Sequence, residues 1–136
     1  PFLIVNGDVW CDYDFARAPR LDAEAQAALV LVPNPPQHPR GDFGLARRAA
    51  DAATTLVDII DAPDVTPRYT YSGIGVYRAE FFEGCVDGRF PLLPLLQRAA
   101  AAGRLRGELH QGAWSDVGTP QRLRELDDRL GSAAVG

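Results

Sequence analysis

Two aspartates stand in short polar motifs that suit a divalent metal ion. Asp8 ends the tripeptide Asn-Gly-Asp at 6–8, directly after an apolar run, and Asp116 stands in the motif Trp-Ser-Asp-Val-Gly-Thr at 114–119. Magnesium takes oxygen ligands and usually only one or two carboxylates from a protein, with phosphate and water oxygens in its other positions. Asp8 and Asp116 would meet that demand, and we predict that they form the two halves of one metal site.

The segments around the two aspartates predict how they are positioned. The apolar run at 2–5 predicts a buried parallel strand, and open α/β sheets bind ligands at the carboxyl ends of such strands. Asp116 follows a short strand-like pair at 113–114 and precedes a turn in which Thr119 could cap a helix that starts at Pro120. We therefore expect Asp8 at the end of a strand and Asp116 at a corner between a strand and a helix.

Each aspartate also has a purely structural interpretation. Asn-Gly-Asp is a common loop former that can simply reverse the chain. Asp116 could be an ordinary acid near the start of a helix. Neither motif is decisive alone. The functional interpretation is favoured because both motifs occur in order, together with the three segments described next.

The two motifs resemble the N-G-D and D-x-G-T elements of the sugar-1-phosphate nucleotidyltransferases, also called nucleoside-diphosphate-sugar pyrophosphorylases. Three further segments match that family in the same order: PPQHPRGDF at 35–43, YTYSGIGVY at 69–77 and FPLLPLL at 90–96. The resemblance is greatest to the branch that acts on N-acetylmuramate 1-phosphate or mannose 1-phosphate. It implies an α/β fold, Rossmann-like with three layers and a mixed sheet, and a catalytic Mg²⁺ held by Asp8 and Asp116.

The activity implied by the resemblance is nucleotidyl transfer from a nucleoside triphosphate to a sugar 1-phosphate, with release of pyrophosphate. UTP with N-acetylmuramate 1-phosphate is the favoured pair, which would place the enzyme in cell-wall recycling, and GTP with mannose 1-phosphate is the alternative. A phosphate oxygen of the sugar phosphate attacks the α-phosphorus directly, so no protein nucleophile is required. A hard cation and positioned donors can supply much of the rate enhancement.

Four residues are predicted to serve the substrate pocket. The family uses the segment that corresponds to Ser72 and Gly73 at the sugar, where a glycine lets a hydroxyl approach the backbone; a glycine inside a strand otherwise indicates a bulge. Asp42 could accept hydrogen bonds from sugar or ribose hydroxyls, or be a turn acid. Asn6 could fix the loop that aims Asp8.

Three ring side chains near these motifs have competing interpretations. His38 and His110 could act as acid or base, but a structural or solvent-facing role is favoured for both. Trp114 is expected to anchor packing rather than to stack on a sugar.

The family opens with a glycine-rich loop of the form G-x-G-T/E-R-M-R-P and a Lys-Pro pair, and neither occurs here. None of the 14 basic residues is a lysine. We therefore expect residues 1–136 to be the C-terminal portion of a single nucleotidyltransferase domain, with the nucleotide-binding half absent. Such a portion is expected to be inactive alone, with the grip on the nucleotide supplied by other sequence.

Two other classes of function remain open. Asp12-Tyr13-Asp14 is a D-x-D triplet, the arrangement by which many glycosyltransferases hold a metal-bound nucleotide sugar, although the triplet is common by chance in acidic loops. A glycosyltransferase would release a nucleotide instead of pyrophosphate. A non-catalytic regulatory or assembly module is the third interpretation, which a native start near Pro1 would favour.

The amino-acid composition excludes several classes of protein. Hydrophobic residues make up 46% and charged residues 24% of the 136 residues, which argues against disorder. The net charge of -4 and the lack of a basic run argue against nucleic acid as a partner. No apolar stretch reaches the roughly 18 residues of a transmembrane helix, so we expect a cytoplasmic protein without a membrane partner. Cys11 and Cys85 lack the spacing of a zinc site.

The remaining elements are predicted from apolar periodicity and from Gly and Pro. Strands are expected at 27–32, 54–60, 69–77 and 105–110, helices at 91–102 and 120–130, at most a short helix within 12–21, and a proline-rich loop at 33–41. The composition of 45–53 favours a helix, whereas the family resemblance favours a β-hairpin there.

Overall fold

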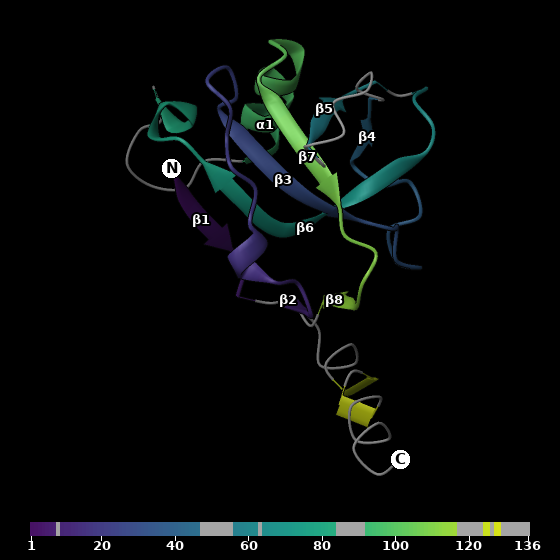
Figure 1. Ribbon diagram of the computed structural model, residues 1–136. Helices are drawn as coiled ribbons and strands as arrows, with labels where there is room; N and C mark the ends of the chain where they lie inside the picture. Colours follow the sequence, from purple (N-terminus) through teal and green to yellow (C-terminus); the bar gives the residue numbers. More distant parts are fainter. Residues whose placement is uncertain are drawn as a thin grey trace.

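The computed structural model describes residues 1–7, 9–46, 56–62, 64–83, 92–116, 124–125 and 127–128, with only the backbone of Asp116. These residues form a six-stranded mixed sheet, a two-stranded ribbon and a helix that covers one face of the sheet (Figure 1). The elements are β1 (Phe2–Val5), β2 (Val9–Cys11), η1 (Phe15–Arg17), β3 (Ala27–Val32), β4 (Phe43–Leu45), β5 (Val57–Ile60), β6 (Arg68–Tyr77), η2 (Ala79–Phe82), α1 (Leu92–Ala101), β7 (Leu105–Leu109) and β8 (Trp114–Asp116).

The main sheet has the order β1-β6-β3-β7-β5-β4, and β4 also pairs with the start of β6. β3 and β7 are parallel, and the other pairs are antiparallel. All six residues of β3 are buried, as expected for a central strand with an apolar sequence that is covered on both faces. The mixed sheet predicted from the family resemblance is confirmed.

The prediction of a buried parallel strand at 2–5 was wrong in two respects, its pairing and its burial. β1 pairs antiparallel with β6 at the end of the sheet, and Phe2, Leu3 and Val5 are each more than 40% exposed. A short apolar run does not by itself reveal its neighbour or its burial. β1 does run in the same direction as β3 and β7, because β1 and β3 are both antiparallel to β6. The carboxyl ends of these three strands therefore share one edge of the sheet.

β6 contains a bulge at the predicted glycine-containing segment. Its register with β3 shifts between Val30, opposite Ile74, and Leu31, opposite Tyr71, which leaves Ser72 and Gly73 without direct partners on β3. Gly73 has φ +90°, a conformation that side chains with a Cβ rarely adopt. The sequence prediction of a bulge or a close backbone approach at this point is confirmed.

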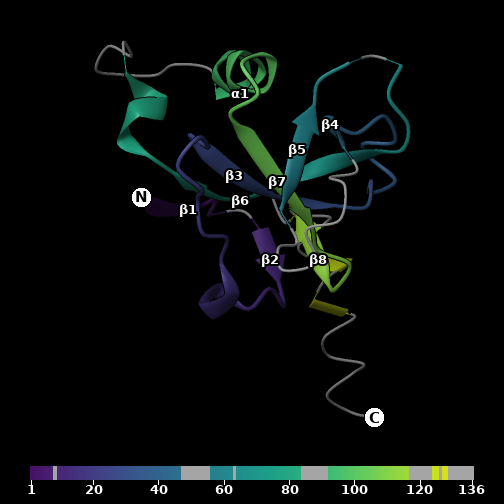
Figure 2. The ribbon, with the colours of Figure 1, turned by 45° about the horizontal axis from the view of Figure 1, so that its top comes forward.

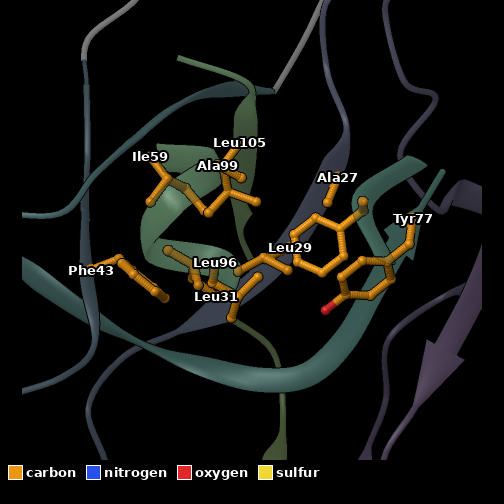
Figure 3. Packing of buried hydrophobic residues seen from close by; sticks show 10 residues of the cluster. Ala27, Leu29, Leu31, Phe43, Ile59, Tyr77, Leu96, Ala99 and Leu105 are labelled. Carbon is orange, nitrogen blue, oxygen red and sulfur yellow. The ribbon is translucent and has the colours of Figure 1, made fainter. Parts of the chain in front are cut away.

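The core lies between α1 and the covered face of the sheet. Figure 3 shows Leu96 and Ala99 of α1 facing Leu29 and Leu31 of β3, and Leu105 of β7 beside them. Each fully buried leucine contributes about 1.5–3 kcal/mol from its removal from water. This packing gives the sheet a rigid base on which the edge loops are built.

β2 and β8 form a separate antiparallel ribbon beyond the carboxyl ends of the main strands. Val9 pairs with Asp116, Trp10 with Ser115 and Cys11 with Trp114. The two strands lie side by side below the main sheet in both views (Figures 1 and 2). The chain enters this ribbon from β1 and returns to it from β7, so segments distant in sequence meet there.

Other predicted elements can be compared directly. The strands at 27–32, 69–77 and 105–110, the helix at 91–102 and the short helical turn within 12–21 are confirmed, with Gly103 ending α1 at φ +70°. β5 covers the end of the segment predicted at 54–60, and β8 extends the predicted pair to include Asp116.

Several predictions fall wholly or partly outside the described residues. They concern Cys85, most of the segments at 45–53 and 120–130, and the turn at 117–120. Residues 124–125 and 127–128 of the last segment are helical. Within the described part of the chain, no helix is both long and apolar enough to cross a bilayer.

Candidate functional site

A pocket of about 400 Å³ opens at the sheet edge where β1, β3 and β7 end. Its lining comes from the residue after β1, the start of β2, the loop after β3, the bulge of β6 and the start of β8. The lining residues are Asn6, Val9, Pro35, Gln37, His38, Thr70, Tyr71, Ser72, Gly73 and Trp114. Binding at the carboxyl ends of strands is the general behaviour of open α/β sheets, and two of the predicted motifs meet here.

Asn6 and Gly73 are in direct contact in this pocket. The Asn6 N–H donates to the Gly73 carbonyl oxygen at 2.9 Å. A Cβ on Gly73 would lie 2.9 Å from Asn6 Nδ2 and 3.0 Å from Asn6 Cβ. The close approach that glycine permits here is therefore made by Asn6, and it fixes the end of β1 against β6.

Ser72 lines the pocket but uses its hydroxyl internally. The residue is only 2% exposed, and Oγ accepts a hydrogen bond from the Ile74 N–H at 3.1 Å. Its carbonyl oxygen accepts a hydrogen bond from Trp114 Nε1 at 2.9 Å. Ser72 thus joins β6 to β8 through a specific polar contact with Trp114. The predicted role of Trp114 in packing rather than in stacking on a sugar stays a prediction.

The structure brings the surroundings of the two predicted metal ligands together. Val9, which follows Asp8, pairs with Asp116 across the ribbon. Asp8 itself and the side chain of Asp116 lie outside the described residues. The residues that are described contain no cluster of three or more His, Cys, Asp or Glu able to hold a metal. The assignment of Asp8 and Asp116 as metal ligands stays a prediction.

The side-chain carboxylate of Asp42 has two hydrogen-bond partners, both of which line the pocket. Its Oδ2 accepts a hydrogen bond from the Tyr71 N–H at 2.8 Å, and its Oδ1 lies 3.0 Å from His38 Nε2. The carboxylate therefore connects β6 to the loop after β3. The role predicted for Asp42, accepting hydrogen bonds from substrate hydroxyls, is untested, and its side chain faces pocket residues rather than forming the lining.

The proline-rich loop at 33–41 is fastened to β6 by Asn34. Its Nδ2 donates to the carbonyl oxygens of Pro39 and Arg68, and its Oδ1 accepts from Thr70 Oγ1. Gly41 has φ +66°, and a Cβ there would lie 2.6 Å from Asn34 Oδ1. Prolines restrict the path of this loop, and Asn34 closes it, so the pocket wall is rigid.

Tyr71 adds a buried hydroxyl pair below the pocket. Its Oη lies 2.8 Å from the hydroxyl of Tyr77. Burial raises the pKa of Tyr71, and burial also raises the pKa of Tyr77, so both phenols stay neutral at physiological pH. These groups can exchange hydrogen bonds but do not add charge to the site.

The D-x-D triplet lies in a different hollow, of about 600 Å³, and its carboxylates have internal partners. Asp12 Oδ1 is 2.8 Å from His110 Nε2, and Asp14 accepts a hydrogen bond from the Ala16 N–H at the start of η1. Hydrogen bonds from the Ala113 backbone and from His110 lower the pKa of Asp12. Tyr13 donates to Glu108, and burial together with this bond raises its pKa.

Sequence reasoning missed the contributions of Thr70, Tyr71 and Asn34, and did not assign His38 to the pocket. A signal for His38 was present: His and Asp four residues apart, flanked by prolines and a glycine, in a segment that must turn. The contact between Asn34 and Thr70 joins positions 36 apart in sequence and left no local pattern.

Comparisons with known proteins agree on one group of enzymes. A family model described as nucleotidyl transferase matches residues 1–132. N-acetylmuramate alpha-1-phosphate uridylyltransferase from Neisseria meningitidis serogroup B is 40% identical over 139 residues, which cover 97% of this chain and 56% of that protein. The protein of the same name from Caulobacter vibrioides is 36% identical over 142 residues, covering 98% of this chain and 56% of that protein. The chain thus spans about half the length of these relatives.

A solved structure shares the fold. It is a presumed glucose-1-phosphate thymidylyltransferase from Bacillus anthracis in complex with a sucrose, with a TM-score of 0.58 and 16% identity. The similarity covers 90% of this chain and 51% of that structure's chain. At this identity the likeness supports the fold alone, and it agrees with the mixed sheet described above.

Proposed function

The chain belongs to the nucleotidyl transferase family, and on that premise we propose that the protein in its full native length transfers the uridylyl group of UTP to N-acetylmuramate 1-phosphate. The products are UDP-N-acetylmuramate and pyrophosphate. Sugar-1-phosphate nucleotidyltransferases are the coarser class to which the matched relatives point. The choice of base and sugar follows the names of the relatives at 40% and 36% identity.

The pairing of Val9 with Asp116 is the observation that carries this proposal. It brings Val9, which follows the Asn-Gly-Asp motif, next to Asp116, which begins the Asp-x-Gly-Thr motif, although the two residues lie near opposite ends of the chain. The same ribbon borders the pocket through Val9 and Trp114. A metal site of two carboxylates next to a polar pocket is the arrangement that phosphate chemistry on a bound sugar needs.

Asp8 and Asp116 would hold Mg²⁺, because two carboxylates with phosphate and water oxygens make up a donor set that this ion prefers. When bound, the ion would offset the negative charge of the reacting phosphates. Asn6 would keep the end of β1 fixed through its bond to Gly73, two positions before Asp8. Trp114 would keep β8 in place through Ser72, two positions before Asp116.

The pocket would hold the sugar 1-phosphate in line with the nucleotide. A non-bridging phosphate oxygen of the sugar phosphate forms a bond to the α-phosphorus of UTP. The bond from that phosphorus to the oxygen bridging to the β-phosphorus breaks, and its electron pair leaves with pyrophosphate. Because no protein nucleophile takes part, the contribution of this chain is positioning and electrostatic stabilisation. We propose that the contacts to the nucleotide come largely from sequence outside residues 1–136.

The test is product analysis with the full-length protein. UTP and GTP are each combined with N-acetylmuramate 1-phosphate and with mannose 1-phosphate in the presence of Mg²⁺. We expect pyrophosphate and UDP-N-acetylmuramate in equal amounts from the first pair and much slower turnover of the others. Release of UDP from a supplied UDP-sugar, without pyrophosphate formation from UTP, would instead identify a glycosyltransferase.

A further inference from the structure

We propose that His38, positioned by Asp42, selects a sugar phosphate that carries a carboxylate. The inference rests on the proposed function and deepens it. N-acetylmuramate 1-phosphate differs from N-acetylglucosamine 1-phosphate by a lactyl ether that ends in a carboxylate. A pocket group that can carry positive charge is one way for an enzyme to separate these two sugars, because it responds to that carboxylate.

His38 lines the pocket with an imidazole that is oriented from one side. Nε2 lies 3.0 Å from Asp42 Oδ1, and the side chain is 43% exposed. Within the described residues, Nδ1 has no hydrogen-bond partner. In the protonated ring both nitrogens donate, so Nε2 can keep Asp42 while Nδ1 donates to a ligand carboxylate.

The imidazole is held in a preorganised position. The His38 N–H donates to the Pro35 carbonyl oxygen at 2.9 Å, which closes a tight turn, and Pro39 restricts His38 to extended backbone. Asp42 is fixed in turn, because its other oxygen accepts from the Tyr71 N–H of β6. Because the ring is already held in place, a ligand that binds to it loses little free energy to ordering of this part of the pocket.

His38 is also the only described residue in the lining that can become positively charged, and none of the described lining residues is acidic. The nearby Arg68 cannot replace it. Its guanidinium donates to the backbone carbonyl oxygens of Arg40, Ala62 and Asp42, which fixes it in the loop. A carboxylate entering this part of the pocket therefore has His38 as its charged partner.

The experiment compares kcat/KM for the two sugar phosphates in the full-length protein. His38→Gln keeps a polar side chain but cannot carry charge, and Asp42→Asn keeps the side-chain shape while weakening the hold on the ring. Gln37→Ala changes the neighbouring lining residue and serves as the matched control. Calorimetric titration with each sugar phosphate gives binding constants without turnover.

We expect His38→Gln to lower kcat/KM and affinity for N-acetylmuramate 1-phosphate about tenfold or more, the effect of losing a hydrogen bond to a charged group. Values for N-acetylglucosamine 1-phosphate should stay within about twofold, and Asp42→Asn should show the same selectivity loss to a smaller degree. Gln37→Ala should leave the ratio of the two substrates unchanged.

Two results would overturn the inference in distinguishable ways. Equal losses for both sugars in His38→Gln, or no loss, with an active wild-type enzyme would remove the selective role of His38 and leave the proposed function intact. A wild-type protein that forms no pyrophosphate from N-acetylmuramate 1-phosphate would overturn the proposed function, and the selection by His38 with it.

Discussion

The indole N–H of Trp114 donates a 2.9 Å hydrogen bond to the carbonyl oxygen of Ser72, and this bond ties β8 to the bulge of β6. Asp116 ends the same short strand. This strand of three residues pairs with β2, and the bond to Ser72 joins it to the main sheet. We therefore expect the position of Asp116 to depend on this tether.

Replacing Trp114 by Phe removes the N–H donor and keeps an aromatic ring. We expect the free energy of unfolding to fall by about 1 kcal/mol, the net contribution of a typical hydrogen bond. We also expect kcat for pyrophosphate release to fall under conditions in which the variant is still fully folded. Trp10→Phe, on the partner strand of the ribbon, is the control and should retain kcat. Equal kcat values for the Trp114 variant and wild type would show that the tether does not matter for turnover.

Gly73→Ala should both destabilise the fold and impair activity. The added Cβ would lie 2.9–3.1 Å from side-chain atoms of Asn6, and the backbone of the new alanine would have to adopt φ +90°. Gly103→Ala is a matched control, because Gly103 also has positive φ but has open space around its position. We expect both variants to lose about 1 kcal/mol from backbone strain, and only Gly73→Ala to lose catalytic activity, measured beside thermal unfolding. Similar activities in the two variants would contradict a role for the contact with Asn6.

Asp22 should make stability depend on acid pH. Partial burial raises the pKa of Asp22. Hydrogen bonds from the backbone N–H groups of Glu24 and Ala25, together with the nearby Arg106, outweigh this effect and bring the pKa below the ordinary 3.8. The lowered folded-state pKa means that Asp22 stabilises the fold above its unfolded pKa, and that this contribution is lost as pH falls through the folded value.

Urea unfolding of wild type and Asp22→Asn at pH 7 and near pH 3 measures this contribution. We expect the variant to be less stable at pH 7 and the difference to shrink at the acid pH. Asp64→Asn, in an exposed turn, should match wild type at both values. A difference for Asp22→Asn that stays constant between the two pH values would rule out the ionic contribution.

The elements with strong local patterns were predictable from sequence. The apolar run of β3, the helix α1 that stops shortly before Gly103 and the glycine-marked bulge of β6 each follow from local chemistry, and the structure has them where expected. The neighbour of β1 could not be predicted in this way, because an apolar run of four residues fits several positions in a sheet.

The candidate site was predictable only in part. The motifs around Asn6 and Trp114 identified two walls of the pocket, since both motifs are contiguous in sequence. The wall formed by His38 and Tyr71 depends on hydrogen bonds from both residues to Asp42 behind it. Asp42 and Tyr71 are 29 positions apart in sequence. Such pairings arise from tertiary packing and leave no periodic signal.

The measurement that tests the central claim most directly is pyrophosphate release by Asp8→Asn and Asp116→Asn in the full-length protein at saturating UTP, N-acetylmuramate 1-phosphate and Mg²⁺. Each variant should lose at least about a hundredfold in kcat, as expected when a group that stabilises charge in the transition state is removed. Asp12→Asn, whose carboxylate is bound to His110, should keep most of the activity. Near-normal turnover in either the Asp8 or the Asp116 variant would contradict the assignment of these two carboxylates to the catalytic metal.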